Sequence, residues 1–60
     1  MIQVGEMVMV RDPAITEEYH VPPAKVVEVR RCPVLLTTEC LLEFDNGKRE
    51  WFNTIWLKKE

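Results

Sequence analysis

Apolar and polar residues alternate with a period of two along most of the chain, which is the pattern of β-strands and not of helices. Short apolar runs occur at Met7–Val10 and Val26–Val29, and looser alternation occurs over 39–45 and 49–53. Asn46-Gly47 stands between the last two runs, and this pair accepts the positive φ angles of a type I′ hairpin turn. The pattern therefore predicts two strands joined by a tight turn in the second half of the chain.

The remaining connections are predicted from the prolines and from small polar residues. Residues 11–23 hold three of the four prolines, which excludes a continuous helix there and predicts a long surface loop between the first two strands. Pro33 and the Thr37-Thr38 pair interrupt the apolar run between the second and third strands. After the fourth strand, Asn53-Thr54 is suited to cap one helical turn, and residues 56–58 are expected to form a short fifth strand.

This order of elements resembles the SH3-like small barrels, a superfamily that includes Tudor and chromo-barrel domains. The resemblance is carried by VGEMVMVRD from Val4, AKVVEV from Ala24 and CLLEFDNGKREWFNTIWL from Cys40. It implies an all-β fold, namely a five-stranded SH3-like (Tudor-like) small barrel with a long loop between strands one and two. Residues 1–60 are then expected to form a single domain.

The side chains of the first strand that face the core can be assigned in two ways. Strict alternation from a solvated Glu6 places the two methionines of Met7–Val10 inside. The barrel resemblance implies the opposite, with a bend near Gly5 and with Val8 and Val10 inside. We favour the second interpretation, because β-branched valines suit a pleated inner face.

On the later strands the alternation separates neighbouring side chains. An outward Glu43 places Cys40, Leu42 and Phe44 inward. Trp51 and Phe52 are adjacent, so they point to opposite faces of one strand, and one of the two rings is expected to stay at least partly exposed.

Composition limits the class of protein. The chain has 60 residues, of which 47% are hydrophobic and 30% charged, with a net charge of −2 and no run of five like charges. A folded domain without a basic or acidic tail is expected. Two cysteines and one histidine are too few for a structural metal, and neither a secretory signal nor a membrane span is recognised. A soluble, cytoplasmic protein with reduced thiols is expected.

The surplus of apolar side chains over both faces is the main indication of function. Isolated monomers seldom expose large contiguous apolar patches, so we expect a non-catalytic protein-interaction module that contacts a protein partner or a second copy of itself. The alternative is that the long loop folds back and covers one face. The expected partner-binding residues are Tyr19, Trp51, Phe52, Trp56, Met7 and Met9.

Two other binding functions remain open. Basic residues at Arg30, Arg31, Lys48 and Arg49 would serve as nucleic-acid contacts beside exposed aromatics. A Tudor-type reader of methylated lysine needs an aromatic cage, for which Tyr19 and Phe44 fit two places. Arg11-Asp12 and Glu50 occupy other cage places, so that cage is incomplete unless a one-residue slip brings in Trp51.

Enzymatic activity is not expected. The chain contains no serine, and nothing in the sequence places His20 beside Cys32 or Cys40 to form a nucleophile pair. No glycine-rich phosphate loop is present. We therefore expect no catalytic residue, no cofactor and no metal.

Overall fold

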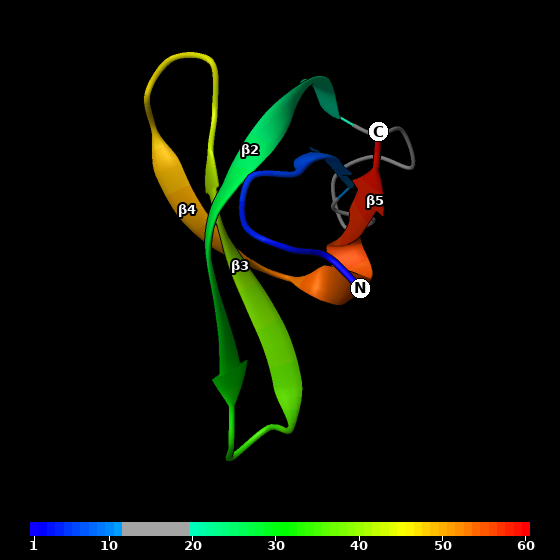
Figure 1. Cartoon of the computed structure of the whole chain (residues 1–60), viewed down its shortest axis with the longest axis vertical. Coiled ribbons are helices and arrows are strands. Elements are labelled where there is room, and N and C mark those ends of the chain that lie inside the picture. Colours follow the sequence, from blue (N-terminus) through cyan, green and yellow to red (C-terminus); the bar gives the residue numbers. More distant parts are fainter. Residues whose placement is uncertain (12–19) are drawn as a thin grey trace.

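The computed structural model describes the backbone of residues 1–11 and 20–60 and the side chains of residues 1–11 and 23–60. Within these residues the protein is all-β, as predicted, with five antiparallel strands in one sheet of order β4-β3-β2-β1-β5 (Figure 1). The strands are β1 (Met7–Val10), β2 (His20–Cys32), β3 (Thr37–Glu43), β4 (Arg49–Asn53) and β5 (Leu57–Lys59). A single 3-10 turn, η1 (Thr54–Trp56), joins β4 to β5.

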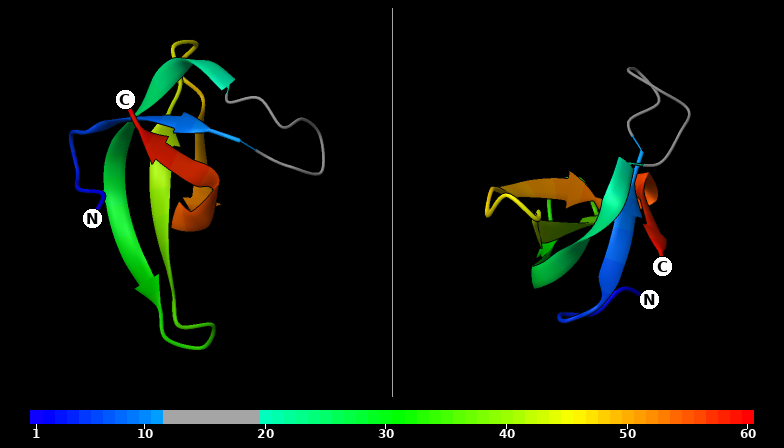
Figure 2. Two further views of the ribbon diagram at one scale, coloured as in Figure 1. Left: turned by 90° about the vertical axis from the view of Figure 1, so that its right-hand side faces the viewer. Right: turned by 90° about the horizontal axis from the view of Figure 1, so that it is seen from above.

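The sheet is open and strongly curled (Figure 2), with β4 and β5 at its two edges. The first part of β2 pairs with β1, and its remainder, from Lys25 to Cys32, pairs with β3. The register shifts between Val8 and Val10 of β1 and between Val26 and Glu28 of β2. Such irregularities bend a strand and increase its twist, so one long strand belongs to both halves of the curled sheet.

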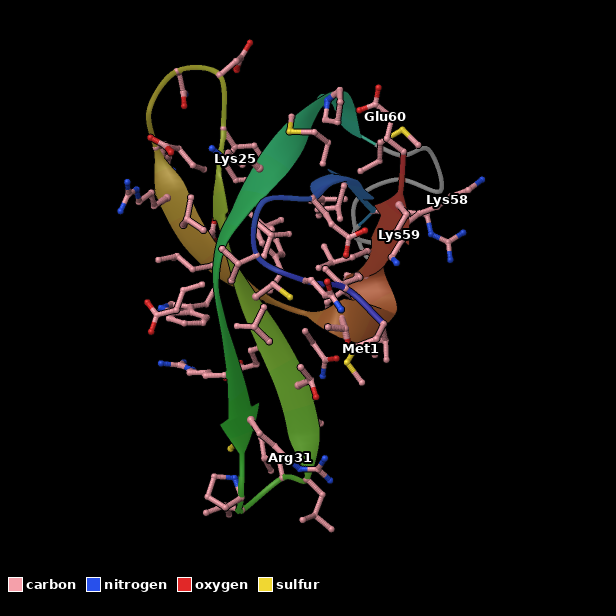
Figure 3. All side chains as sticks on the ribbon, viewed as in Figure 1. Met1, Lys25, Arg31, Lys58, Lys59 and Glu60 are labelled. Carbon is pink, nitrogen blue, oxygen red and sulfur yellow. The ribbon has the colours of Figure 1, made fainter. Side chains whose placement is uncertain are left out.

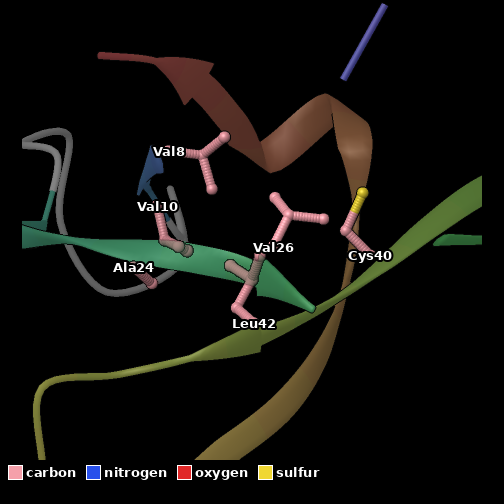
Figure 4. Packing of buried hydrophobic residues seen from close by; sticks show 6 residues of the cluster. All are labelled: Val8, Val10, Ala24, Val26, Cys40 and Leu42. Atoms are coloured by element: carbon pink, nitrogen blue, oxygen red, sulfur yellow. The ribbon is translucent and has the colours of Figure 1, made fainter. Parts of the chain in front are cut away.

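The core lies on the inner, concave face of the sheet (Figure 4). Its buried residues are Val8, Val10, Ala24, Val26, Cys40 and Leu42. The inward direction predicted for Val8 and Val10 is therefore confirmed, as is that of Cys40 and Leu42. The bend also falls where it was expected, because Gly5 has a φ of 94° in a turn between Gln3 and Glu6. Glycine adopts this conformation without the strain that a Cβ would introduce.

The hairpin between β3 and β4 lies where it was predicted, but its turn is of another type. Gly47 N donates to Phe44 O at 2.9 Å, and Phe44 N donates to Lys48 O at 2.9 Å, which leaves a three-residue loop. Gly47 has a φ of 85°, whereas Asn46 has no positive φ. The type I′ prediction is therefore wrong. This hydrogen bonding suits a type I turn followed by a left-handed glycine, which accommodates one more residue than the two-residue loop.

The other boundaries are confirmed in part. The predicted loop over residues 11–23 ends earlier than expected, because β2 already begins at His20. Prolines at 22 and 23 are tolerated there, since this part of β2 has no β3 partner and lies within the irregular pairing to β1. Asn53 caps η1 as predicted, with its Oδ1 accepting from Ile55 N at 3.1 Å. Trp56 belongs to η1, so the fifth strand begins one residue later than predicted.

Candidate interaction surface

Trp51 and Phe52 lie on opposite faces of β4. Phe52 pairs with Cys40 in the β3–β4 register and packs against the core, and its ring meets that of Phe44 edge-on, with centroids 6.0 Å apart. Trp51 pairs with Leu41, whose side chain points away from the core, so the tryptophan ring lies on the outer, convex face. Phe52 is therefore the core aromatic, and Trp51 is the one left outside.

An arginine stacks on the ring of Trp51. The guanidinium of Arg30 on β2 stacks over the Trp51 ring at 3.8 Å from its centroid. Arg30 Nε also binds Glu39 Oε1 at 3.1 Å. The cation–π contact and the ion pair together hold the arginine across three strands, and Trp51 stays half-buried.

Those of the predicted partner-binding residues that the structure describes are not brought together into one patch. Met7 and Met9 lie on the outer face of β1, which β2 and β3 separate from the β4 strand of Trp51. Trp56 lies in η1, where its carbonyl oxygen accepts from Arg11 N at 2.9 Å. Tyr19 lies outside the described residues. Its role as an interface or cage residue stays a prediction.

The aromatic residues considered for a methyl-lysine cage also diverge. Phe44 packs on the inner face, whereas Trp51 lies on the outer face. The two rings therefore do not face one common space.

The basic residues are dispersed, and several of them are neutralised by carboxylates. Arg49 lies 3.7 Å from Glu43, and Lys59 lies 3.2 Å from Glu6. Figure 3 shows Arg31 near the end of the β2–β3 hairpin, far from Lys25 and from the lysines of β5. Lys48 belongs to the β3–β4 turn. Among the described residues, these cations therefore do not form one continuous basic surface.

A cluster of exposed apolar side chains in the described part of the chain was missed by the sequence interpretation. The β2–β3 hairpin projects from the rest of the molecule (Figures 1 and 2), and its connecting turn spans residues 33–36. Here Val34 is 86% exposed, Leu35 70% and Leu36 72%. We call these three residues the apolar tip. The signal was present in the sequence, because hairpin turns normally carry glycine or polar residues.

Leu36 also has an unusual backbone conformation. Its φ is 53°, and it is the only non-glycine residue with a positive φ among the described residues. A left-handed conformation costs a residue with a Cβ about 1–2 kcal/mol. A large apolar side chain therefore occupies a turn position that favours glycine or asparagine, and it is exposed there.

A shallow depression lies at the base of this projecting hairpin. It has a volume of about 280 Å³ and is lined by Met1, Ile2, Val29, Thr38 and Thr54. Val29 and Thr38 come from the arms of the hairpin, and the threonine hydroxyls are the polar side-chain groups of this lining. The depression is thus lined mainly by apolar side chains and lies on the same hairpin as the tip.

Among the described residues, the pKa values of two titratable groups are clearly shifted. Gln3 N donates to Glu6 Oε1 at 2.6 Å, and with Lys59 this lowers the pKa of the Glu6 carboxyl. Burial raises the pKa of the Cys40 thiol, and both cysteines are free. Among the described residues, no group of three or more His, Cys, Asp or Glu side chains is placed to hold a metal ion. No helix in the described part of the chain is long and apolar enough to cross a membrane.

Comparison with known proteins adds no family: no family model, curated protein or solved structure matches the chain. Any functional argument therefore depends on the residues themselves.

Proposed function

We propose that this protein is a non-catalytic protein-interaction module of the SH3-like type and that it contacts its partner through the apolar tip of the β2–β3 hairpin. The observation that carries the proposal is the exposure of Val34, Leu35 and Leu36 side by side on a projecting turn. Monomeric proteins tolerate scattered apolar residues, but clustered ones commonly mark contact sites.

The conformation of Leu36 supports the same conclusion. A strained residue persists only where the surrounding structure or the function requires it. Leu36 is mostly exposed, so its side chain adds little to the core that would offset its left-handed backbone. A partner that buries the side chain would supply the missing stabilisation.

The energy available at the tip is moderate. Full burial of a Val or Leu side chain contributes about 1.5–3 kcal/mol, so covering the exposed parts of these three contributes roughly 3–7 kcal/mol. The exposed fractions used are those of Val34, Leu35 and Leu36. Association itself costs about 4 kcal/mol or more in lost freedom of motion. The tip therefore serves as an anchor, and tight binding requires additional contacts around it.

The SH3-like assignment rests on the order of elements. The elements follow the order on which the resemblance was based: four longer strands with a tight hairpin between β3 and β4, then one 3-10 turn and a short β5. The pairing of β5 with β1 brings the two ends of the sequence to one edge of the curled sheet. These features support an SH3-like arrangement in which the sheet stays open.

The proposal is tested by removing the tip side chains without disturbing the core. The test variant carries Leu35→Ser and Leu36→Gly, and the control carries Val4→Ser, an exposed apolar residue that does not belong to the β2–β3 hairpin. Both variants should keep the cooperative melting of the parent protein. Affinity-tagged parent and control should retain the same specific proteins from the cells that encode the chain, and the tip variant should lose them. An unchanged set of retained proteins with the tip variant would contradict the proposal.

A further inference from the structure

Resting on the proposed function, we infer that the binding site on the partner protein is an apolar groove with an acidic rim. The apolar tip enters the groove, and the guanidinium of Arg31 meets a carboxylate at its edge. The inference comes from the charges that surround the tip and from two classes of occupant that fit the tip less well.

The projecting part of the hairpin, residues 29–38, contains two arginines and no carboxylate. Arg30 is already engaged, since it binds Glu39 and stacks on Trp51. Arg31 is exposed and, among the described residues, forms no ion pair. Figure 3 shows it close to the end of the hairpin. The tip therefore presents an apolar end with one available positive charge beside it.

Arg31 lies on the inner side of the hairpin, which is also the side of the depression. It pairs with Thr38 in the β2–β3 register, and Thr38 lines the depression. A partner that covers the tip and extends toward the depression must pass Arg31. A carboxylate at that point gains a charge-assisted hydrogen bond, which is stronger than a neutral one.

An anionic lipid surface fits these observations less well. Basic segments that bind such membranes carry about four to eight Lys or Arg residues, whereas the tip has one unpaired arginine. The hairpin segment 29–38 contains no aromatic residue to anchor at a lipid interface, and the chain has a net charge of −2.

A second copy of the chain is also disfavoured. The tip offers only three exposed side chains, so a reciprocal contact of two tips falls short of the roughly 1,200 Å² that a stable interface buries. A two-fold axis that laid each tip in the partner's depression would also bring two Arg31 residues together, because Arg31 lies between Val29 and the tip. Like charges at this position oppose such a dimer.

The experiment begins with a photo-crosslinking probe. The amino acid p-benzoylphenylalanine is introduced at Leu35 and, as a control, at Val4, in the cells that encode the protein. A protein crosslinked from Leu35 and not from Val4 is identified, purified and titrated with the parent chain and its variants. Leu35→Ser should weaken binding about tenfold, because most of one leucine side chain loses its apolar contact.

The charge of the groove is then tested with a matched pair of variants. Arg31→Glu should weaken binding about three- to tenfold, whereas Lys48→Glu, an exposed cation in the opposite hairpin, should leave it unchanged. Higher salt should weaken the parent complex and not the Arg31→Glu complex. Replacing the contacting carboxylate of the partner by lysine should restore binding of Arg31→Glu.

The outcomes separate the inference from the proposal on which it rests. If the purified partner is sensitive to Leu35→Ser but binds Arg31→Glu and the parent equally well, the acidic rim is wrong and the interaction module stands. If binding is insensitive to Leu35→Ser, or if Leu35 crosslinks only to phospholipid or to nothing, both are wrong. If Leu35 crosslinks only to a second copy of the chain, the acidic-rimmed groove is wrong and the interaction module stands.

Discussion

Replacing Leu36 by glycine should give a more stable protein than replacing it by alanine, which reverses the usual order of these two residues. Both substitutions remove the same exposed side chain, which is 72% accessible in the parent protein. Alanine keeps a Cβ at a φ of 53°, and this costs about 1–2 kcal/mol. Glycine avoids that cost, but it lowers the free energy of unfolding by about 0.4–1 kcal/mol because the unfolded chain gains conformational freedom.

The difference between the two variants is therefore about 1 kcal/mol in favour of glycine. For a domain of this size, 1 kcal/mol corresponds to a shift in Tm of about 4–8 °C. Thermal melting followed by circular dichroism measures the shift, and urea unfolding gives the free energy independently.

Leu35 provides the matched control, because it is equally exposed in the same turn and has no positive φ. At position 35 the ordinary order should hold, with alanine more stable than glycine. An alanine variant at position 36 that is as stable as the glycine variant, or more stable, would refute the reasoning. Leu36 would then not be strained, and its conformation would give no support to a functional tip.

Three further predictions follow from the faces of the sheet and from the perturbed groups. Phe52→Ala should lower the free energy of unfolding by roughly 3 kcal/mol and Trp51→Ala by only about 1 kcal/mol, because Phe52 packs on the core and Trp51 on the outer face. Equal losses in urea titrations would be inconsistent with that assignment. Cys32 should react with Ellman's reagent in the folded protein before Cys40, since burial raises the pKa of the Cys40 thiol and leaves little thiolate. Equal reaction rates of the two thiols would contradict this. The lowered pKa of Glu6 means that its ionised form stabilises the fold, so the contribution is present at neutral pH and is lost as pH falls through the folded pKa. Glu6→Gln should therefore melt below the parent near neutrality, and the difference should close in acid; a gap in Tm independent of pH would argue against it.

The sequence predicted the fold class and the residues of the inner face better than the boundaries of the strands and the type of turn. Strict alternation from Glu6 would have placed the methionines of β1 inside, and only the barrel resemblance and the preference of β-branched valines for an inner face correctly placed Val8 and Val10 there. Prolines were interpreted as ending β2 on its N-terminal side, yet a strand tolerates them where no neighbour needs their missing N–H. The type of the β3–β4 turn depended on one backbone angle at Asn46, which sequence statistics alone do not determine.

The functional surface was the least predictable part. The expected interface relied on aromatic residues, but the pleat places Trp51 and Phe52 on opposite faces of β4 and an arginine stacks on Trp51. The apolar tip was overlooked because Val34, Leu35 and Leu36 were interpreted only as an apolar run that Pro33 and the Thr37-Thr38 pair interrupt. Their exposure depends on how far β2 and β3 extend as a hairpin, which is a property of the long-range pairing.

The pairing of β1 with β5 has a consequence for how the chain is made. Val10 is opposite Leu57, and Glu60 N donates to Met7 O at 3.2 Å, so the first strand is completed by the last residues of the sequence. Pairing β1 with β5 closes a loop that contains all of the chain between them, and this is slow compared with forming the local β2–β3 and β3–β4 hairpins. During synthesis the two hairpins can therefore assemble first, while the edge of β1 stays uncovered until residues 57–59 have left the ribosome.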